Sequence, residues 1–302
     1  MPGSTRAFAT SEAFERAAAS RLGRRPRRLL AAFTTVGGAA GLLLTLAFFT
    51  IAWLADVIAP IDPFASVGRP LSPPSRLHVL GTDDLGRDLL AGVVHGTRTS
   101  LLVALSATLL ASTIGVVVGS LAGYRPGTVD DLLMRATELV LVIPRFFLAV
   151  VVIALFGAGS DRMILVLGLT SWPVIARVVR AQTLSLAGRD FVDAARALGA
   201  PEARVLIRHV LPNAVPAAFV VISLNAASVI LLEAGLGFLG LGDPRMMSWG
   251  YLANNAQRFL RVAWWMALFP GSAIALAVLG LNLLGDAVND FLDPQARRTP
   301  EA

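Results

Sequence analysis

Long apolar runs separated by polar stretches dominate this chain. Because an α-helix rises about 1.5 Å per residue, about 20 apolar residues cross the roughly 30 Å hydrocarbon core of a bilayer. Six runs approach that length, at about 30–54, 100–121, 139–156, 163–179, 214–232 and 264–284. The pattern predicts an all-α membrane protein with six transmembrane helices, formed by a domain at 30–290 between tails at 1–29 and 291–302.

Composition supports this interpretation. Of the 302 residues, 55% are hydrophobic and only 15% are charged, which is too apolar for one soluble domain. The first apolar run follows a basic stretch but is longer than a signal-peptide core, and no small-residue cleavage pattern ends it. We therefore expect an uncleaved first span in the lipid bilayer.

The distribution of arginine predicts the orientation. An even number of spans places both termini on one side, and arginine carries all the positive charge because the sequence contains no lysine. If both termini are cytoplasmic, most arginines lie in cytoplasmic segments, as the positive-inside rule requires. This orientation also places the polar segment between the fourth and fifth spans in the cytoplasm.

That polar segment predicts a helical elbow. Its defining positions are Asp193, Ala194, Ala195, Gly199, Leu211 and Pro212. Phe191, Leu198 and the two alanines share one face of a short amphipathic helix, and charged residues take the other. Gly199 suits the left-handed conformation that ends a helix, and Pro201 suits the first turn of a second helix running to Pro212. The small alanines would let a partner surface come close.

The segment resembles the cytoplasmic coupling motif of ABC importer permeases, in which glutamate-alanine-alanine precedes a glycine and then isoleucine-any-leucine-proline. Asp193 stands for the glutamate and His209 for the isoleucine. The resemblance implies that residues 189–212 couple the chain to a separate ATPase subunit, which binds ATP and Mg²⁺. Without lysine, this chain cannot form the phosphate-binding loop of such ATPases. We expect no catalysis and no cofactor in the chain itself.

A second motif lies in the proline-rich connection after the first span. It comprises Gly81, Thr82, Asp83, Gly86, Arg87 and Asp88. Local chemistry predicts that Thr82 caps a helix whose first turn carries Asp83 and Asp84. The string resembles an external signature of the dipeptide, oligopeptide and nickel branch of ABC importer permeases. The glycine-rich segment 233–242 also resembles this branch. It would form either part of an outer gate or a purely structural re-entrant turn.

The resemblance covers about residues 78–294 and implies that the chain belongs to an assembly in the bacterial inner membrane. It comprises two homologous permeases, two cytoplasmic ATPase subunits and an extracytoplasmic solute-binding protein. This chain would form half of the translocation pathway for peptides or a similar small solute. The three histidines lie far apart, so we expect no metal site, which favours peptides over nickel. The sequence has no basic patch with interleaved aromatic residues, so we expect no nucleic-acid binding.

Three polar residues within the spans are candidates for the solute path, namely Arg145, Asn225 and Ser228. A charge facing lipid is costly, so Arg145 either snorkels or pairs, or it lines the path. Pro144 and Pro173 predict kinks in their spans.

Two other classes of protein are weaker interpretations. A self-sufficient secondary transporter normally carries paired acids or ion sites inside the membrane, and the predicted spans are almost free of acids. An intramembrane hydrolase needs a nucleophile and a base within the bilayer, and no histidine lies in a predicted span. Copurification with an ATPase separates the permease from both.

Overall fold

The computed structural model describes residues 35–292, and the regular elements in this range are helices. The long ones are α2 (Val36–Trp53), α4 (Leu89–Tyr124), α7 (Ser160–Ala187), α10 (Leu211–Phe238) and α12 (Trp265–Leu292). The shorter ones are α3 (Ala55–Ile58), α5 (Thr128–Val142), α6 (Arg145–Phe156), α8 (Asp190–Ala197), α9 (Glu202–Val205) and α11 (Trp249–Ala256), with a π-helical turn at Leu206–Val210 and a 3₁₀ turn at Gln257–Phe259. The predicted all-α class is confirmed.

Five helices are long and apolar enough to cross a membrane, and α5 with α6 supplies a sixth crossing if the bent pair is one span. The two helices meet at 76° around Pro144. Because a residue before proline is disfavoured in the helical conformation, Ile143 is extended and ends α5. The kink predicted at Pro144 is thus a complete break, whereas α7 continues through Pro173.

The helices extend beyond the predicted spans. The runs at 100–121, 163–179 and 214–232 are the central parts of α4, α7 and α10, and α12 continues past the predicted end at 284. Residues 30–34 of the first predicted span lie outside the described range. An apolar run marks the part of a helix that suits hydrocarbon, while polar residues continue the same helix on either side.

Small residues hold the central helices together. Gly115, Gly119 and Gly123 recur every four residues on α4, and the α7 backbone packs directly against them. A Cβ at Gly119 would lie 2.4 Å from the carbonyl oxygen of Ala176, so only glycine permits this approach. Helix α10 packs against α4, α7 and α12, and α2 packs against α12.

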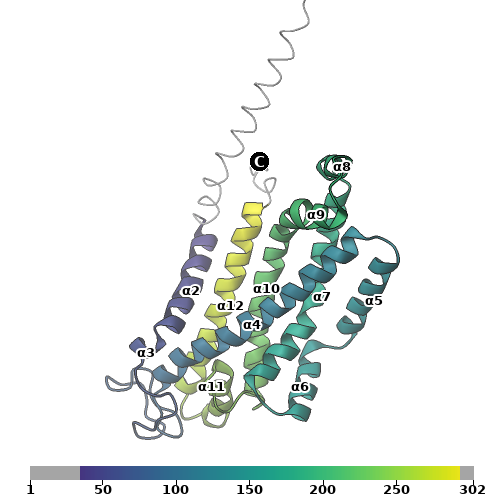
Figure 1. The fold of residues 1–302 in the computed structure, drawn as a ribbon. Coiled ribbons are helices and arrows are strands. Elements are labelled where there is room, and N and C mark those ends of the chain that lie inside the picture. The colour runs from purple at the N-terminus through teal and green to yellow at the C-terminus, as the bar shows by residue number, and fades with distance from the viewer. Residues whose placement is uncertain (1–34, 293–302) are drawn as a thin grey trace, which may run out of the picture.

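The bundle has two different ends (Figure 1). Helices α8 and α9 lie at one end, together with the start of α2 and the end of α12. We call residues 189–212 the elbow and this end the elbow end. Residues 59–88, the α3–α4 loop, lie at the opposite end beside α11. We call that end the loop end.

Candidate functional site

The elbow begins with α8, which ends as the sequence predicts. Gly199 adopts a φ of +81°, the left-handed region that glycine enters without strain. Its N–H donates to the Arg196 carbonyl at 2.8 Å, and the Ala200 N–H donates to the Ala195 carbonyl at 3.1 Å. These bonds satisfy carbonyls at the end of α8 and turn the chain toward α9.

The second half of the elbow differs from the prediction. No helix ends at Pro212; instead α9 passes through the π-helical turn into α10, which starts at Leu211. Pro212 lies in the first turn of α10, where its missing N–H is harmless. The Asn213 side-chain amide donates to the His209 carbonyl at 2.7 Å across this junction. The elbow therefore continues directly into a membrane-spanning helix.

The apolar face predicted for α8 divides into an inner and an outer part. Val192 is buried in a small cluster with Val205 and Val210, and Ala195 is half-buried against it. Phe191 and Ala194 are exposed, and Leu198 is 89% exposed. The predicted face did not include Val192, the buried residue that anchors α8. The outer residues remain a stripe of small and apolar side chains.

Arg196 ties the elbow to the end of α4. Its guanidinium lies 3.2 Å from Asp193 and 3.4 Å from Glu202, measured between nitrogen and carboxylate oxygen. It also lies over the ring of Tyr124, 5.6 Å from the ring centre, and the Tyr124 hydroxyl donates to Glu202. Because Tyr124 is the last residue of α4, this network joins α8, α9 and α4. The Asp193 carboxylate already has a partner within the chain.

Arg145 belongs to a polar cluster in the middle of the bundle. Its Nη1 lies 3.3 Å from Ser171 Oγ and 3.5 Å from Asn225 Oδ1. The Asn225 amide in turn lies 3.5 Å from Thr108 Oγ1. The four residues come from α6, α7, α10 and α4, and Ser171, Asn225 and Thr108 are buried. The structure thus brings together two of the three residues predicted for the path.

The cluster lies at mid-depth, since Thr108, Ser171 and Asn225 are near the centres of their helices. Arg145 is therefore directed at neutral polar side chains within the bundle and is not paired with an acid of the described residues. An arginine at the centre of a membrane helix costs about 2.5–3.5 kcal/mol on insertion scales, and such residues mark functional sites. Ser228 lies apart from the cluster and donates to the Leu224 carbonyl of its own helix.

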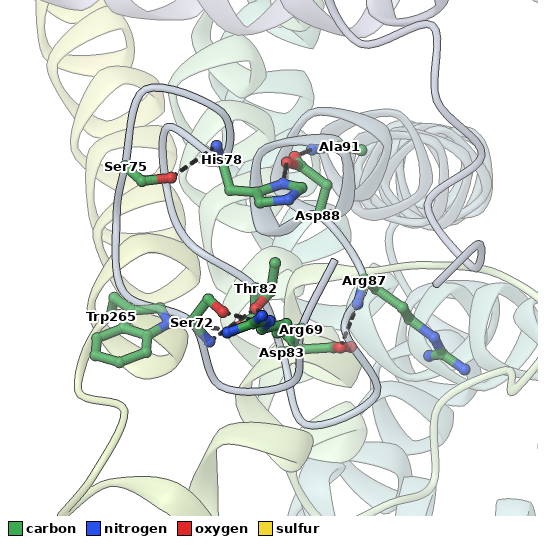
Figure 2. A network of polar contacts seen from close by, with 10 residues as sticks. All are labelled: Arg69, Ser72, Ser75, His78, Thr82, Asp83, Arg87, Asp88, Ala91 and Trp265. Atoms are coloured by element: carbon green, nitrogen blue, oxygen red, sulfur yellow. Dashed lines mark hydrogen bonds and ion pairs between the residues drawn. The ribbon is translucent and has the colours of Figure 1, made fainter. Parts of the chain in front are cut away.

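At the loop end, Thr82 is the centre of a network that folds the α3–α4 loop (Figure 2). Its hydroxyl donates to the Arg69 carbonyl at 2.6 Å and accepts from the Ser72 N–H at 2.9 Å. Its carbonyl accepts from Trp265 Nε1 at 3.1 Å. Thr82 therefore joins two parts of the loop to the start of α12.

The helix predicted after Thr82 is absent; residues 81–88 form a tight loop, and α4 starts at Leu89. Asp83 Oδ1 accepts from the backbone N–H groups of Leu85 and Arg87 at 2.9 and 2.8 Å. Burial raises the pKa of the Asp83 carboxyl above its usual value, although these two bonds oppose the shift. Positive φ angles at Gly81 and Gly86 prevent a continuous helix through this segment.

Asp88 is the residue that caps α4. Its Oδ1 accepts from the Ala91 N–H at 3.0 Å, and its Oδ2 lies 2.8 Å from His78 Nδ1. Arg87 donates to the Tyr251 hydroxyl at 3.1 Å and lies over the Phe64 ring. The motif thus links the loop to α4, α11 and α12. The cap was predicted six residues too early because Thr82 and Asp88 carry the same capping chemistry.

Residues 233–238 do not form a re-entrant turn, because α10 continues to Phe238. Glu233, for which the sequence pattern predicted no role, is buried and accepts a hydrogen bond from Ser100 Oγ at 3.0 Å. A Cβ at Gly237 would lie 2.7 Å from the Gly250 Cα, so α11 packs directly on α10. An acid inside an apolar run was the available signal for this buried contact.

Asp243 closes the connection after α10. Its carboxylate accepts from the Ser160 N–H at the start of α7 at 3.2 Å and contacts the Arg245 guanidinium. Burial opposes ionisation of Asp243, but hydrogen bonds from Arg245 and Ser160 outweigh it and lower its pKa to about 2. The ionised carboxylate therefore fixes the α10–α11 connection to α7.

Comparison with known proteins agrees with this architecture. Residues 115–298 match the family described as binding-protein-dependent transport system inner membrane component. This chain belongs to that family. It is therefore a multi-pass inner-membrane protein and a transport permease component, as the resemblance of its motifs indicated.

Individual relatives are transport permeases. The chain is 38% identical to the di/tripeptide transport system permease protein DppC of Pseudomonas aeruginosa, over 86% of this chain and 89% of the relative. It is 37% identical to the glutathione transport system permease protein GsiD of Pectobacterium atrosepticum, over 87% and 88%. It is 36% identical to the dipeptide transport system permease protein DppC of Bacillus subtilis, over 86% and 82%. These relatives are consistent with this chain being the permease subunit of an ABC importer.

Proposed function

We propose that this permease carries peptides, that it forms half of the pathway together with a second homologous permease, and that its elbow receives the movement of an ATPase subunit. Two ATPase subunits would hydrolyse ATP with Mg²⁺, and an extracytoplasmic binding protein would deliver the solute. The names of the relatives, which refer to dipeptides, tripeptides and glutathione, support a peptide solute.

The observation that carries the coupling proposal is the outer face of α8. Phe191, Ala194 and Leu198 lie exposed on a helix beyond the end of the spans. A row of exposed apolar side chains on a rigid support is typical of a protein–protein contact. Ala194 at the centre of this row leaves room for a partner backbone or a large partner side chain.

The anchoring of α8 explains how a push on the elbow would reach the membrane. Val192 of α8 packs against Val205 and Val210, and Arg196 links α8 to Tyr124 at the end of α4. The π-helical turn links α9 to α10. A displaced α8 therefore moves the ends of α4 and α10 together. These two helices also hold Thr108 and Asn225 of the mid-depth cluster. Movement at the elbow would thus change the pathway at mid-depth.

The arginine distribution supports an orientation in which the elbow and both termini are cytoplasmic. In this orientation the loop end faces the binding protein. Arg69, Leu77 and Leu85 of the α3–α4 loop are exposed and available for such a contact. The absence of lysine supports ATP hydrolysis on a different chain.

The coupling proposal is tested by replacing Ala194 with tryptophan. We expect Ala194→Trp to release the ATPase or to lower solute uptake per ATP hydrolysed by at least about tenfold, because the new ring occupies the contact surface. Ala194→Ser keeps the small size and should retain normal coupling. The measurements are copurification of the ATPase and uptake by proteoliposomes. Normal uptake by Ala194→Trp with the ATPase bound would show that the elbow is not the coupling surface.

A further inference from the structure

The Arg145 guanidinium is poorly satisfied by its own chain. A guanidinium has five N–H donors, and both contacts of Arg145 use Nη1, at 3.3 and 3.5 Å. These distances are at or beyond the long end of the range for N–H···O bonds. A few side-chain atoms of the described residues are buried from solvent and lack a hydrogen-bond partner, and no nitrogen of Arg145 is one of them. The remaining donors therefore reach space that the chain leaves open.

Arg145 also lacks the counter-charge that some other arginines have. Arg180 lies 2.5 Å from Asp130, and Arg98 lies 3.0 Å from Asp56. Within residues 35–292, no carboxylate oxygen lies within 4.0 Å of the Arg145 guanidinium. Arginine stays protonated in proteins. The centre of the bundle thus holds a permanent positive charge whose polar neighbours are neutral.

Part of α10 next to Asn225 in the sequence is exposed. Leu224, directly before Asn225, is 40% exposed, and Ser228 one turn later is partly exposed. Arg145 itself is half-buried and contacts both Asn225 of α10 and the buried Ser171 of α7. Its free donors are therefore placed to meet a group that arrives from outside this chain.

We propose that Arg145 binds a carboxylate of the transported solute at mid-depth. The proposal rests on the peptide permease function proposed above and adds a recognition chemistry to it. A guanidinium pairs with a carboxylate through two parallel hydrogen bonds, and the low dielectric of the site strengthens this pairing. Ser171 and Asn225 hold the guanidinium from one side, so its free side faces the path. The residue is a specificity determinant for solutes with a free carboxylate.

The test compares two probes that differ only in this group, trialanine with a free carboxylate and trialanine amide. Uptake of both is measured in proteoliposomes containing the complete complex with its binding protein. The ratio of acid uptake to amide uptake is compared between wild type and variants. Any preference of the binding protein is common to all samples and cancels in this comparison.

We expect Arg145→Gln to lower uptake of the acid about tenfold, the usual effect of losing a charge-assisted hydrogen bond, and to leave amide uptake nearly unchanged. Asn225→Asp places a carboxylate beside the Arg145 guanidinium, so it should compete with the solute and lower acid uptake in the same way. Because Asn225→Asp keeps both the cation and the side-chain size, it decides the question if Arg145→Gln fails to assemble. Arg162→Gln, at the start of α7, should leave the ratio unchanged.

An equal loss for both probes, or no loss for either, overturns the proposal. Equal loss would indicate that Arg145 instead pairs with an acid of the second permease or only supports the fold. If the wild-type complex imports neither probe in an ATP-dependent manner, the proposed peptide function itself fails. That result is distinct from wild-type uptake that does not respond to Arg145.

Discussion

The α3–α4 loop and the elbow both carry a family-like motif, and their residues are used differently. In the loop, Thr82, Asp83 and Asp88 all form hydrogen bonds within the chain and are buried. In the elbow, Ala194 and Gly199 are exposed and have no packing role of that kind. One motif is explained by how the chain folds. The other has exposed residues that contacts within the described chain do not explain.

The glycines show the same difference. A Cβ at Gly86 would lie 2.2 Å from the carbonyl oxygen of Gly68, whereas a Cβ at Gly199 would meet nothing within 4 Å. Both residues have a positive φ. Gly86 is therefore required for conformation and for packing, while Gly199 is required for conformation alone. A motif residue with no contact inside the chain is the better candidate for a contact with a partner.

The largest effect on stability is expected for a substitution in the α3–α4 loop. Gly86→Ala should lower the free energy of unfolding by more than about 2 kcal/mol, because steric overlap adds to the cost of a positive φ. Gly199→Ala should cost about 1 kcal/mol, the conformational part alone. Gly188→Ala is the matched control, since its Cβ meets nothing within 4 Å and its φ is −96°.

Thermal unfolding of the purified protein in detergent measures these three variants side by side. Equal losses for Gly86→Ala and Gly199→Ala would mean that packing in the loop contributes nothing beyond backbone conformation. The contrast between a self-contained loop and an open elbow would then be wrong.

A pH-dependent effect tests a second self-contained region, the α10–α11 connection that contains Asp243. The pKa of Asp243 in the folded protein, about 2, is below its ordinary value of 3.8, so ionisation favours folding. Its contribution is complete above about pH 5 and is lost as the pH falls through 2. Asp243→Asn should therefore cost about 2 kcal/mol at pH 7. The cost should shrink toward pH 2, as measured by thermal unfolding across this range; a cost independent of pH would contradict it.

Much of this architecture could be predicted from the sequence, because membrane spans obey one simple constraint of length and polarity. A kink at Pro144 and the turn at Gly199 followed from the backbone chemistry of proline and glycine, but the complete break at Pro144 was not predicted. The cap at Asp88 was not predicted either, because several neighbouring residues have the same capping ability. Only the long-range bonds that join Thr82 to Arg69 and to Trp265 select the loop form.

The candidate sites show the same limit. Arg145 and Asn225 were recognised as polar residues within spans, but their contact depends on how α6 packs beside α10. The inner residue of α8, Val192, was missed because an eight-residue helix has too few positions for periodicity to choose between faces. Local patterns identified the residues, and tertiary packing decided which of them meet.

The most direct test of the account is the accessibility of Leu198. The chain contains no cysteine, so a single Leu198→Cys variant can be labelled at one position with a water-soluble maleimide. Leu77→Cys is the control, because Leu77 is 82% exposed at the loop end. If the elbow is the coupling surface, the bound ATPase blocks labelling at position 198 and leaves labelling at position 77 unchanged. Equal labelling at position 198 with and without the ATPase would contradict the coupling role of the elbow.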